Sequence, residues 1–320
     1  MSRRALFVAA ALVAWIAGAT LGSVPHGGGA QAQAAPAIVV GKVKANFTPE
    51  LTGTKPIFIL ALGSDARPGT PVARGLGDSI HIIGINPAKN EATVLGFPRD
   101  SWVNIPGHGT AKINEALYDG GPELMAKTLT SITGIPIDYY VLTSFDGVKN
   151  AVDEVGGLVI DVPWPMHDPY SKADFNPGVQ RLKGFDVLAF ARDRHDFTEG
   201  DFARSENQGR VLLAALTQFN KEYAKDPSRA LNWIGAGEQN IQTSLTLPEL
   251  FDFAYEATSF NPKKVENIVA QGSIGFEGAE SVVHLLSSNA AIYKDMRDDA
   301  IVAKKNLPPS PTAGNPIAGG

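Results

Sequence analysis

The chain has 320 residues, of which 44% are hydrophobic and 19% charged, and its formal net charge is −5. This composition is typical of a globular protein with a sizeable core, and it excludes a largely disordered chain and a multi-span membrane protein. A negative total charge disfavours nucleic acid as a partner, because broad binding to phosphate backbones needs an excess of Lys and Arg. The sequence has no cysteine, which excludes disulfides, thiolate metal sites and thiol nucleophiles.

The first 35 residues predict export across a membrane. Arg3 and Arg4 precede an uncharged apolar run over residues 5–24, and the next charged residue is Lys42. A basic segment before an apolar one, with small residues after it, is typical of a signal peptide. The run is also long enough to stay in place as a membrane anchor with a cytoplasmic N-terminus. We therefore expect an extracytoplasmic protein, either anchored to the cell membrane or secreted to the cell envelope.

Alternating strand and helix patterns over residues 53–298 predict one α/β domain. Short apolar runs bounded by Gly or Pro indicate strands, and apolar residues at helical spacing indicate helices. The expected strands are 57–62, 80–85, 92–97, 139–142 and 158–162; the expected helices are 122–132, 145–155, 185–191, 201–223, 247–258 and 280–295. Such interleaving favours a largely buried sheet. Residues 1–35 also contain the linker to this domain, and the Pro/Gly-rich residues 307–320 predict a disordered tail.

Acidic and arginine residues stand at the ends of the predicted strands, where α/β sheets bind their ligands. Asp65 and Arg67 follow the first strand, Asp78 precedes the second, and Arg99 and Asp100 close the third. Two carboxylates beside a phosphate are the usual protein ligands of Mg²⁺, and a guanidinium group matches the geometry of a phosphate. Ordinary surface turns are also rich in Asp and Gly, so the pattern alone leaves both interpretations open.

A second group of charged residues lies further along the chain. Arg192 and Arg194 are two residues apart, so in an extended segment they point to one side. Asp201, Arg204 and Gln208 have the spacing of one stripe along a helix. A phosphate-binding cluster explains both spacings, and a solvated charged loop that precedes a helix with ion pairs explains them equally well.

Other chemistry is weakly indicated or missing. Lys112 and Asn114 are candidates to contact an anion or a sugar, and His195 is interpreted as a loop residue rather than a base. The sequence contains no phosphate-binding P-loop, nucleophile elbow, zinc-protease helix or dinucleotide fingerprint. Its six histidines show no spacing typical of metal ligands.

Taken in chain order, these motifs resemble the LytR–CpsA–Psr family. The matching segments are LGSDAR at 62–67, GDS at 77–79, PRD at 98–100, KIN at 112–114, GGP at 120–122, IDYY at 137–140, VGGL at 155–158, LKGFDVLA at 182–189, ARDR at 191–194 and GDFAR at 200–204, with Gln208. Each motif is short, but the ordered set over residues 57–213 is specific.

The resemblance implies an α/β fold with a single mixed central sheet, helices on both faces (α-β-α layers) and a long apolar lipid pocket. It implies transfer of a glycan-1-phosphate from a polyprenyl-pyrophosphate carrier to a peptidoglycan hydroxyl, assisted by Mg²⁺. Asp65 and Asp78 are then metal ligands. The expected pyrophosphate contacts are Arg67, Arg99, Lys112, Arg192, Arg194, Arg204 and Gln208. We expect Arg99, Arg192 and Arg194 to act in catalysis, and Asp100 or Asp193 to take the acceptor proton.

Three positions depart from the family pattern. Leu76 and Asn207 stand where the family usually has arginine, and Ser79 stands where it often has threonine. Arg74 and Arg210 are the nearest arginines that would compensate. The loss of phosphate contacts keeps two alternatives open: a polyprenyl-pyrophosphate pyrophosphatase and a non-catalytic lipid-pyrophosphate-binding protein. Export disfavours a third, the transcription regulator that the family's name suggests.

Overall fold

The computed structural model describes residues 38–42, 55–197, 200–226, 228–229, 233, 241–243 and 261–313. The predicted signal peptide or anchor over residues 1–35 and the predicted helix over residues 247–258 lie outside this part of the chain. None of the described helices is both long and apolar enough to cross a membrane.

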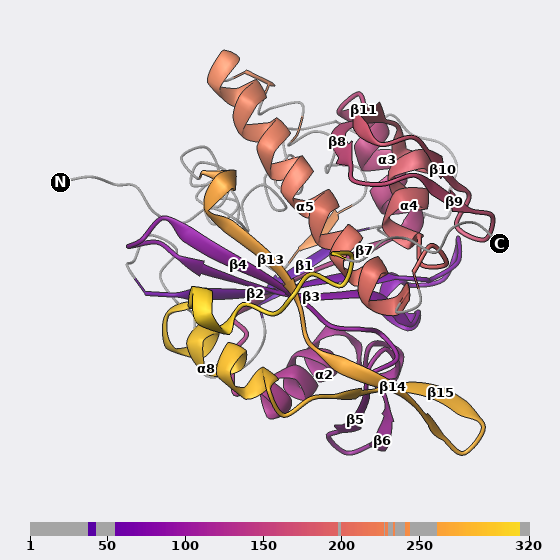
Figure 1. Cartoon of the computed structure of the whole chain (residues 1–320), viewed down its shortest axis with the longest axis vertical. Helices are drawn as coiled ribbons and strands as arrows, with labels where there is room; N and C mark the ends of the chain where they lie inside the picture. The colour runs from indigo at the N-terminus through magenta and orange to yellow at the C-terminus, as the bar shows by residue number, and fades with distance from the viewer. Residues whose placement is uncertain are drawn as a thin grey trace, which may run out of the picture.

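A mixed sheet forms the centre of the fold, in the strand order β12-β1-β7-β2-β3-β4-β13 (Figure 1). The strands are β1 (Ile38–Lys42), β2 (Ile57–Ser64), β3 (Gly77–Asn86), β4 (Glu91–Gly96), β7 (Tyr139–Ser144), β12 (Ile241–Thr243) and β13 (Val265–Val269). β2 runs antiparallel to β3 but parallel to β7, and β4 pairs in parallel with β13. The expected single mixed sheet is confirmed.

Helices cover both faces of this sheet (Figure 1). One face packs against α3 (Phe145–Glu154), α4 (Gly184–Arg192) and α5 (Gly200–Lys225), and the other against α2 (Glu115–Thr133) and α8 (Asn289–Asp299). β2 shows why the layers form, because successive side chains of a strand point to opposite faces. Ile57 and Ile59 enter one core while Phe58 and Leu60 enter the other. An unbroken apolar run is thus buried on both sides.

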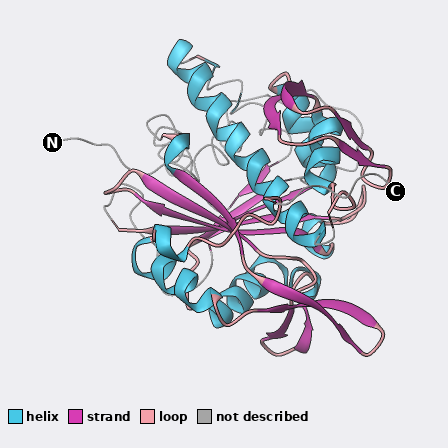
Figure 2. Cartoon of the chain, viewed as in Figure 1, coloured by secondary structure: helices cyan, strands magenta, loops and turns pink. Residues whose placement is uncertain are grey.

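Four two-stranded antiparallel sheets accompany the central sheet among the described residues (Figure 2). They are β5 (Trp102–Ile105) with β6 (Gly109–Lys112), β8 (Leu158–Val162) with β11 (Gly178–Leu182), β9 (Met166–Asp168) with β10 (Ala173–Phe175), and β14 (Gly272–Glu277) with β15 (Glu280–Leu285). The predicted helix over 280–295 is wrong in its first half. There, Val282 and Val283 favour a strand, which pairs with β14 across a turn at Gly278 with φ +62°.

Part of the predicted disordered tail is instead packed against α5. Ser310 and Thr312 donate hydroxyl hydrogen bonds of 2.7 Å to the carboxylate of Glu206, which is 5% exposed. Arg210 lies 3.0 Å from the same carboxylate. A buried charge needs such partners, which explains why this segment is ordered as far as residue 313 despite its proline content. Residues 314–320 lie outside the described residues.

Replacing both hydroxyl donors, by Ser310→Ala with Thr312→Val, is expected to lower the free energy of unfolding by about 1–3 kcal/mol, because Glu206 stays buried with fewer hydrogen bonds. Urea denaturation measures this as a lower midpoint at unchanged slope. The matched control is Thr217→Val with Ser228→Ala, two exposed positions. Equal midpoints for the two double variants would show that the segment adds no stability.

Candidate functional site

The ends of β2 and β3 carry the first predicted site residues. The register of the two strands shifts at Gly63 and Ser64, which leaves Asp78 as the extra residue of a β-bulge. A bulge bends its strand and re-aims a side chain. On the α5 side, Gln208 donates a hydrogen bond of 3.0 Å to the backbone carbonyl of Asp78. The bulge is therefore fixed to the helix that carries the later motifs.

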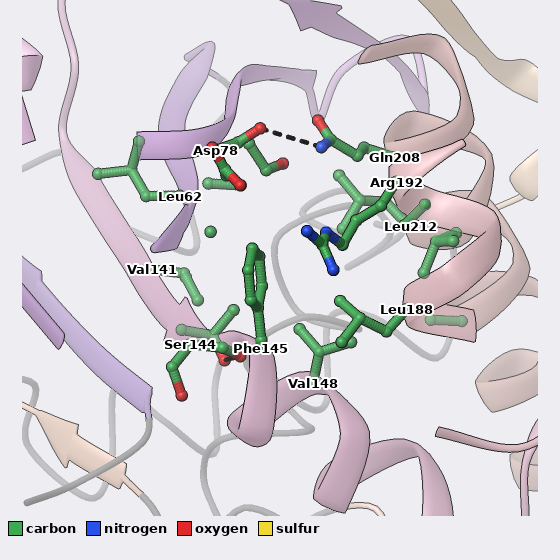
Figure 3. Close-up of a pocket in the computed structure, with 17 residues that line it drawn as sticks. Leu62, Asp78, Val141, Ser144, Phe145, Val148, Leu188, Arg192, Gln208 and Leu212 are labelled. Atoms are coloured by element: carbon green, nitrogen blue, oxygen red, sulfur yellow. Dashed lines mark hydrogen bonds between the residues drawn. The ribbon is translucent and has the colours of Figure 1, made fainter. Parts of the chain in front are cut away.

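An apolar cavity lies between the sheet and helices α3, α4 and α5 (Figure 3). It encloses about 830 Å³ of space between atoms, its open mouth included. Its lining is mostly aliphatic and comprises Ala61, Leu62, Gly63, Asp78, Ser79, Val141, Thr143, Ser144, Phe145, Val148, Leu188, Ala191, Arg192, Gln208, Val211, Leu212 and Ala215. The charged members are Asp78 and Arg192. A cavity of this chemistry is suited to a hydrocarbon chain.

A second, polar cavity adjoins the first and is called the arginine cavity here. It is lined by Asp78, Arg99, Asp168, Tyr170, Ser171, Arg192, Arg194, His195 and Arg204. Four guanidinium groups face two carboxylates in this lining, which favours an anionic ligand. The two cavities share Asp78 and Arg192. The structure thus joins an apolar chamber to a cationic one.

Ion pairs hold two of the four arginines in place. Arg99 pairs with the carboxylate of Asp78, and the buried Arg204 pairs with Asp201 one turn before it on α5. Burial lowers the pKa of Arg204, and Asp201 opposes that effect. Burial acts in the same direction on Arg99, but Asp78, Asp100 and Asp201 together outweigh it, and the pKa of Arg99 is raised. The carboxylates therefore keep closely spaced positive charges compatible with a folded site.

Arg192 is the last residue of α4 and contacts both cavities. Its guanidinium carbon lies 4.8 Å from the ring centroid of Phe145, and Figure 3 shows the two side chains meeting within the cavity. Stacking on an aromatic face orients a guanidinium group while its N–H donors remain available. Arg192 is thereby positioned where an apolar ligand would end in a charged head.

Asp168, Tyr170 and His195 line the arginine cavity although the sequence did not indicate them as site residues. The carboxylate of Asp168 is fully buried, lies 2.8 Å from His195 Nδ1 and accepts backbone N–H groups, among them that of Arg194 at 3.3 Å. Burial opposes the charged form, but these hydrogen bonds lower the pKa of Asp168 to about 2. Asp168 therefore fixes the loop that carries Arg194 and His195, and no spacing in the sequence signals a contact between such distant segments.

A third cavity, the hairpin groove, runs between the start of α5 and the β14–β15 hairpin. It is lined by Asp100, Arg194, His195, Phe197, Gly200, Asp201, Ile274, Ser281, Val282 and Val283. Arg194 and His195 belong to this groove and to the arginine cavity. Burial, reinforced by the nearby charge of Asp201, raises the pKa of Asp100. Asp100 is thus a stronger base than an ordinary carboxylate.

Four predicted site residues line none of the three cavities: Asp65, Arg67, Lys112 and Asp193. Asp65 accepts a hydrogen bond of 2.7 Å from the backbone N–H of Leu76, and Arg67 is exposed. Lys112 lies 3.8 Å from Asp100 and contacts neither cavity.

Asp193 is also absent from both linings. Burial and the charges of Asp196 and Asp168 raise its pKa to about 8. Its side chain is buried and lines none of the three cavities, whereas Arg192 and Arg194 both line the arginine cavity. The prediction that Asp193 takes a proton at the arginines does not match this position.

The residues that depart from the family pattern lie outside the arginine cavity. Asn207 is fully buried, and its amide makes no hydrogen bond to the part of the chain that is described. Arg74 donates to the carbonyl of Tyr118 at 3.4 Å, and Arg210 pairs with Glu206. Neither arginine lines the cavity, so neither compensates for the replaced family arginines.

The carboxylates allow only a sparse metal site. No group of three or more His, Cys, Asp or Glu side chains among the described residues is arranged to hold a metal ion. Mg²⁺, however, usually takes one or two protein carboxylates and completes its shell with phosphate and water. Asp78 lies in the arginine cavity, and Asp65 stands at the adjacent end of the neighbouring strand. This donor set fits Mg²⁺ bound together with a phosphate ligand.

A mixed α/β fold in which an apolar cavity meets a cluster of arginines defines a class of protein suited to amphiphilic anions. The chain belongs to the LytR_cpsA_psr family, whose model matches residues 29–301.

Several known proteins are similar to this chain. Polyisoprenyl-teichoic acid–peptidoglycan teichoic acid transferase TagV of Bacillus subtilis (strain 168) is 29% identical over 72% of this chain and 61% of its own length. Transferase TagU of Bacillus mycoides (strain KBAB4), which has the same full name, is 32% identical over 64% of this chain and 66% of its own length. The chain spans less than two thirds of the length of these curated relatives. A structure of TagT bound to LI-WTA has a TM-score of 0.65 and 25% identity, with 81% of this chain and 96% of that chain covered.

Asp168→Asn is expected to lower the free energy of unfolding at pH 7 by about 1–3 kcal/mol, because it removes a buried, multiply bonded carboxylate. The folded pKa of about 2 lies below the ordinary value of 3.8. The stabilisation is therefore complete above pH 3.8 and is lost as the pH falls towards 2. Urea denaturation at several pH values should show the gap between wild type and variant closing in that window. The control is Asp174→Asn, an exposed carboxylate beside His167. A gap that persists at pH 2 would contradict this account.

Proposed function

We propose that the chain transfers a glycan-1-phosphate from a polyprenyl-pyrophosphate carrier to a hydroxyl of peptidoglycan. The observation that carries this proposal is the junction of the apolar cavity and the arginine cavity at Asp78 and Arg192. A polyprenyl pyrophosphate has the same two parts, a hydrocarbon chain and a doubly charged head, in the same order. The names of the TagV and TagU relatives support the substrate class.

The two cavities bind the two parts of the carrier by different forces. Each square ångström of isoprenoid surface that leaves water contributes about 25 cal/mol, and the aliphatic lining of α4 and α5 provides that burial. The pyrophosphate meets Arg192, Arg194 and Arg99, whose guanidinium groups donate paired hydrogen bonds to phosphate oxygens. Arg204 is more deeply buried and supplies positive charge from behind.

Phosphoryl transfer depends mainly on position and charge, so a covalent nucleophile is not required. The acceptor oxygen forms a bond to the sugar-proximal phosphorus. The bond from that phosphorus to the bridging oxygen breaks, and polyprenyl phosphate leaves with the electron pair. The arginines neutralise the charge that spreads over the phosphoryl oxygens. Asp100, which unlike Asp193 lines a cavity beside Arg194 and whose pKa lies above that of an ordinary carboxylate, takes the proton from the acceptor.

The metal ion of the proposed reaction is Mg²⁺. Asp78, with Asp65 beside it, would hold Mg²⁺, which when bound supplies further neutralisation of phosphate charge. We also propose that residues 1–35 export the chain, so that it acts outside the cytoplasm and beside the membrane that holds its lipid substrate.

Arg192→Ala is expected to lower the rate of glycan transfer by about a hundredfold or more, because it removes a charged donor from the junction of the cavities. The assay follows labelled glycan from a polyprenyl-pyrophosphate donor into isolated peptidoglycan. Arg297→Ala, which removes an exposed arginine of α8, is the control and should act at the native rate.

An Arg192→Ala protein with the native transfer rate would overturn the assignment. Omitting peptidoglycan tests the pyrophosphatase alternative. A wild-type protein that releases phosphate equally fast without peptidoglycan is a hydrolase, and one that binds the donor but neither transfers nor hydrolyses is a binding protein.

Removal of divalent ions is expected to abolish transfer, and added Mg²⁺ is expected to restore it. Asp78→Asn should raise the Mg²⁺ concentration needed for half-maximal activity by about tenfold or more. Asp146→Asn, at an exposed ion pair with Lys149, serves as the control. Full transfer by chelator-treated protein would refute the metal requirement while leaving the arginine site intact.

A further inference from the structure

We propose that the hairpin groove binds the saccharide that carries the accepting hydroxyl. This inference rests on the transfer proposed above and assigns a separate subsite to the second substrate. The groove encloses about 830 Å³, its open mouth included. Because Arg194 and His195 line both the groove and the arginine cavity, a ligand in the groove meets the phosphates at these two residues.

One face of the β14–β15 hairpin supplies an apolar surface to the groove. In the register, Ile274 pairs with Val283 and Phe276 pairs with Ser281. Residues that are opposite each other, or two apart on one strand, share a face of the hairpin. Phe276 therefore lies on the same face as Ile274, Ser281 and Val283, which all line the groove. Ile274 is 51% exposed and Phe276 is 71% exposed. Exposed apolar groups beside a cleft mark a binding surface, and the C–H face of a pyranose ring matches an aromatic side chain.

The polar side of the groove favours a neutral ligand with many hydroxyls. Asp100 and Asp201 both line it, and Asp201 Oδ2 is buried without a hydrogen-bond partner among the described residues. Ionised carboxylates only accept hydrogen bonds, so they recognise the hydroxyl donors of a sugar. The lining contains one arginine, Arg194, against these two carboxylates. A second phosphate bound there would therefore meet a net negative charge. The groove therefore differs in chemistry from the arginine cavity beside it.

The hairpin is also fixed to the loop that carries the arginine site. The backbone N–H of Val283 donates a hydrogen bond of 2.9 Å to the carbonyl of Asp100, and Ser101 forms a β-bridge with Val283. These contacts hold the apolar face of the hairpin in a fixed position relative to Asp100. A sugar stacked on that face presents its hydroxyls towards Asp100.

The test uses two hairpin variants, the single variant Phe276→Ala and the double variant Ile274→Ala/Phe276→Ala. The control is Phe185→Ala, which removes a 57% exposed phenylalanine outside the three cavities. With saturating polyprenyl-pyrophosphate-linked glycan and varied peptidoglycan oligosaccharides, the hairpin variants should raise the KM for the oligosaccharide about tenfold. Release of polyprenyl phosphate to water and binding of the donor should not change.

An unchanged KM for the oligosaccharide would overturn the groove assignment and leave the transferase function standing. An equal loss of donor binding would also overturn it, because the hairpin would then serve the lipid substrate. If the wild type transfers no glycan at all, the proposed function fails, and direct titration with the oligosaccharide decides the groove. Binding that is lost in Phe276→Ala supports the groove, and no binding by the wild type refutes it.

Discussion

The paired charges between the sheet and α5 are the constraint on which the site depends. Arg99 pairs with Asp78 at the β-bulge, and Gln208 is bonded to the Asp78 carbonyl from the helix. Arg204 needs Asp201 because an unpaired guanidinium group in its buried position would cost several kcal/mol. Of these contacts, the hydrogen bond from Gln208 fixes α5 against β3 at the point where the two cavities meet. The same carboxylates that allow the arginines to cluster therefore also determine where the cluster is located.

The sequence predicted the parts of the site that follow from local periodicity. The helical spacing of Asp201, Arg204 and Gln208 was confirmed, because it depends on a helix that α5 provides. Arg192 and Arg194 both line the arginine cavity, but Arg192 is the last residue of α4, so the expected extended segment begins only after it. Asp193 lines none of the three cavities, and the spacing of the motif alone does not distinguish its place from that of its neighbours.

The sequence did not indicate contacts that only the tertiary fold creates. Asp168 and His195 lie 27 residues apart and meet because β9 returns beside the loop after α4. The segment that forms β15 was predicted to be helical, because its pairing with β14 does not show in the local pattern of the sequence. In the C-terminal segment, proline content predicted disorder, whereas the buried Glu206 provides partners for Ser310 and Thr312. In each case a distant partner outweighed the local preference of the chain.

The serial arrangement of the three cavities bears on how a transferase would avoid hydrolysis. Arg192 stands at the first junction and Arg194 at the second, so phosphates bound in the arginine cavity would lie between two binding regions. Water competes with any hydroxyl acceptor, and an enzyme limits that competition by filling the space around the phosphorus. In the proposed mechanism, a lipid chain in the apolar cavity would close one side. A saccharide in the hairpin groove would close the other and bring its hydroxyl to Asp100, so that binding of the acceptor would both supply the nucleophile and exclude its main competitor.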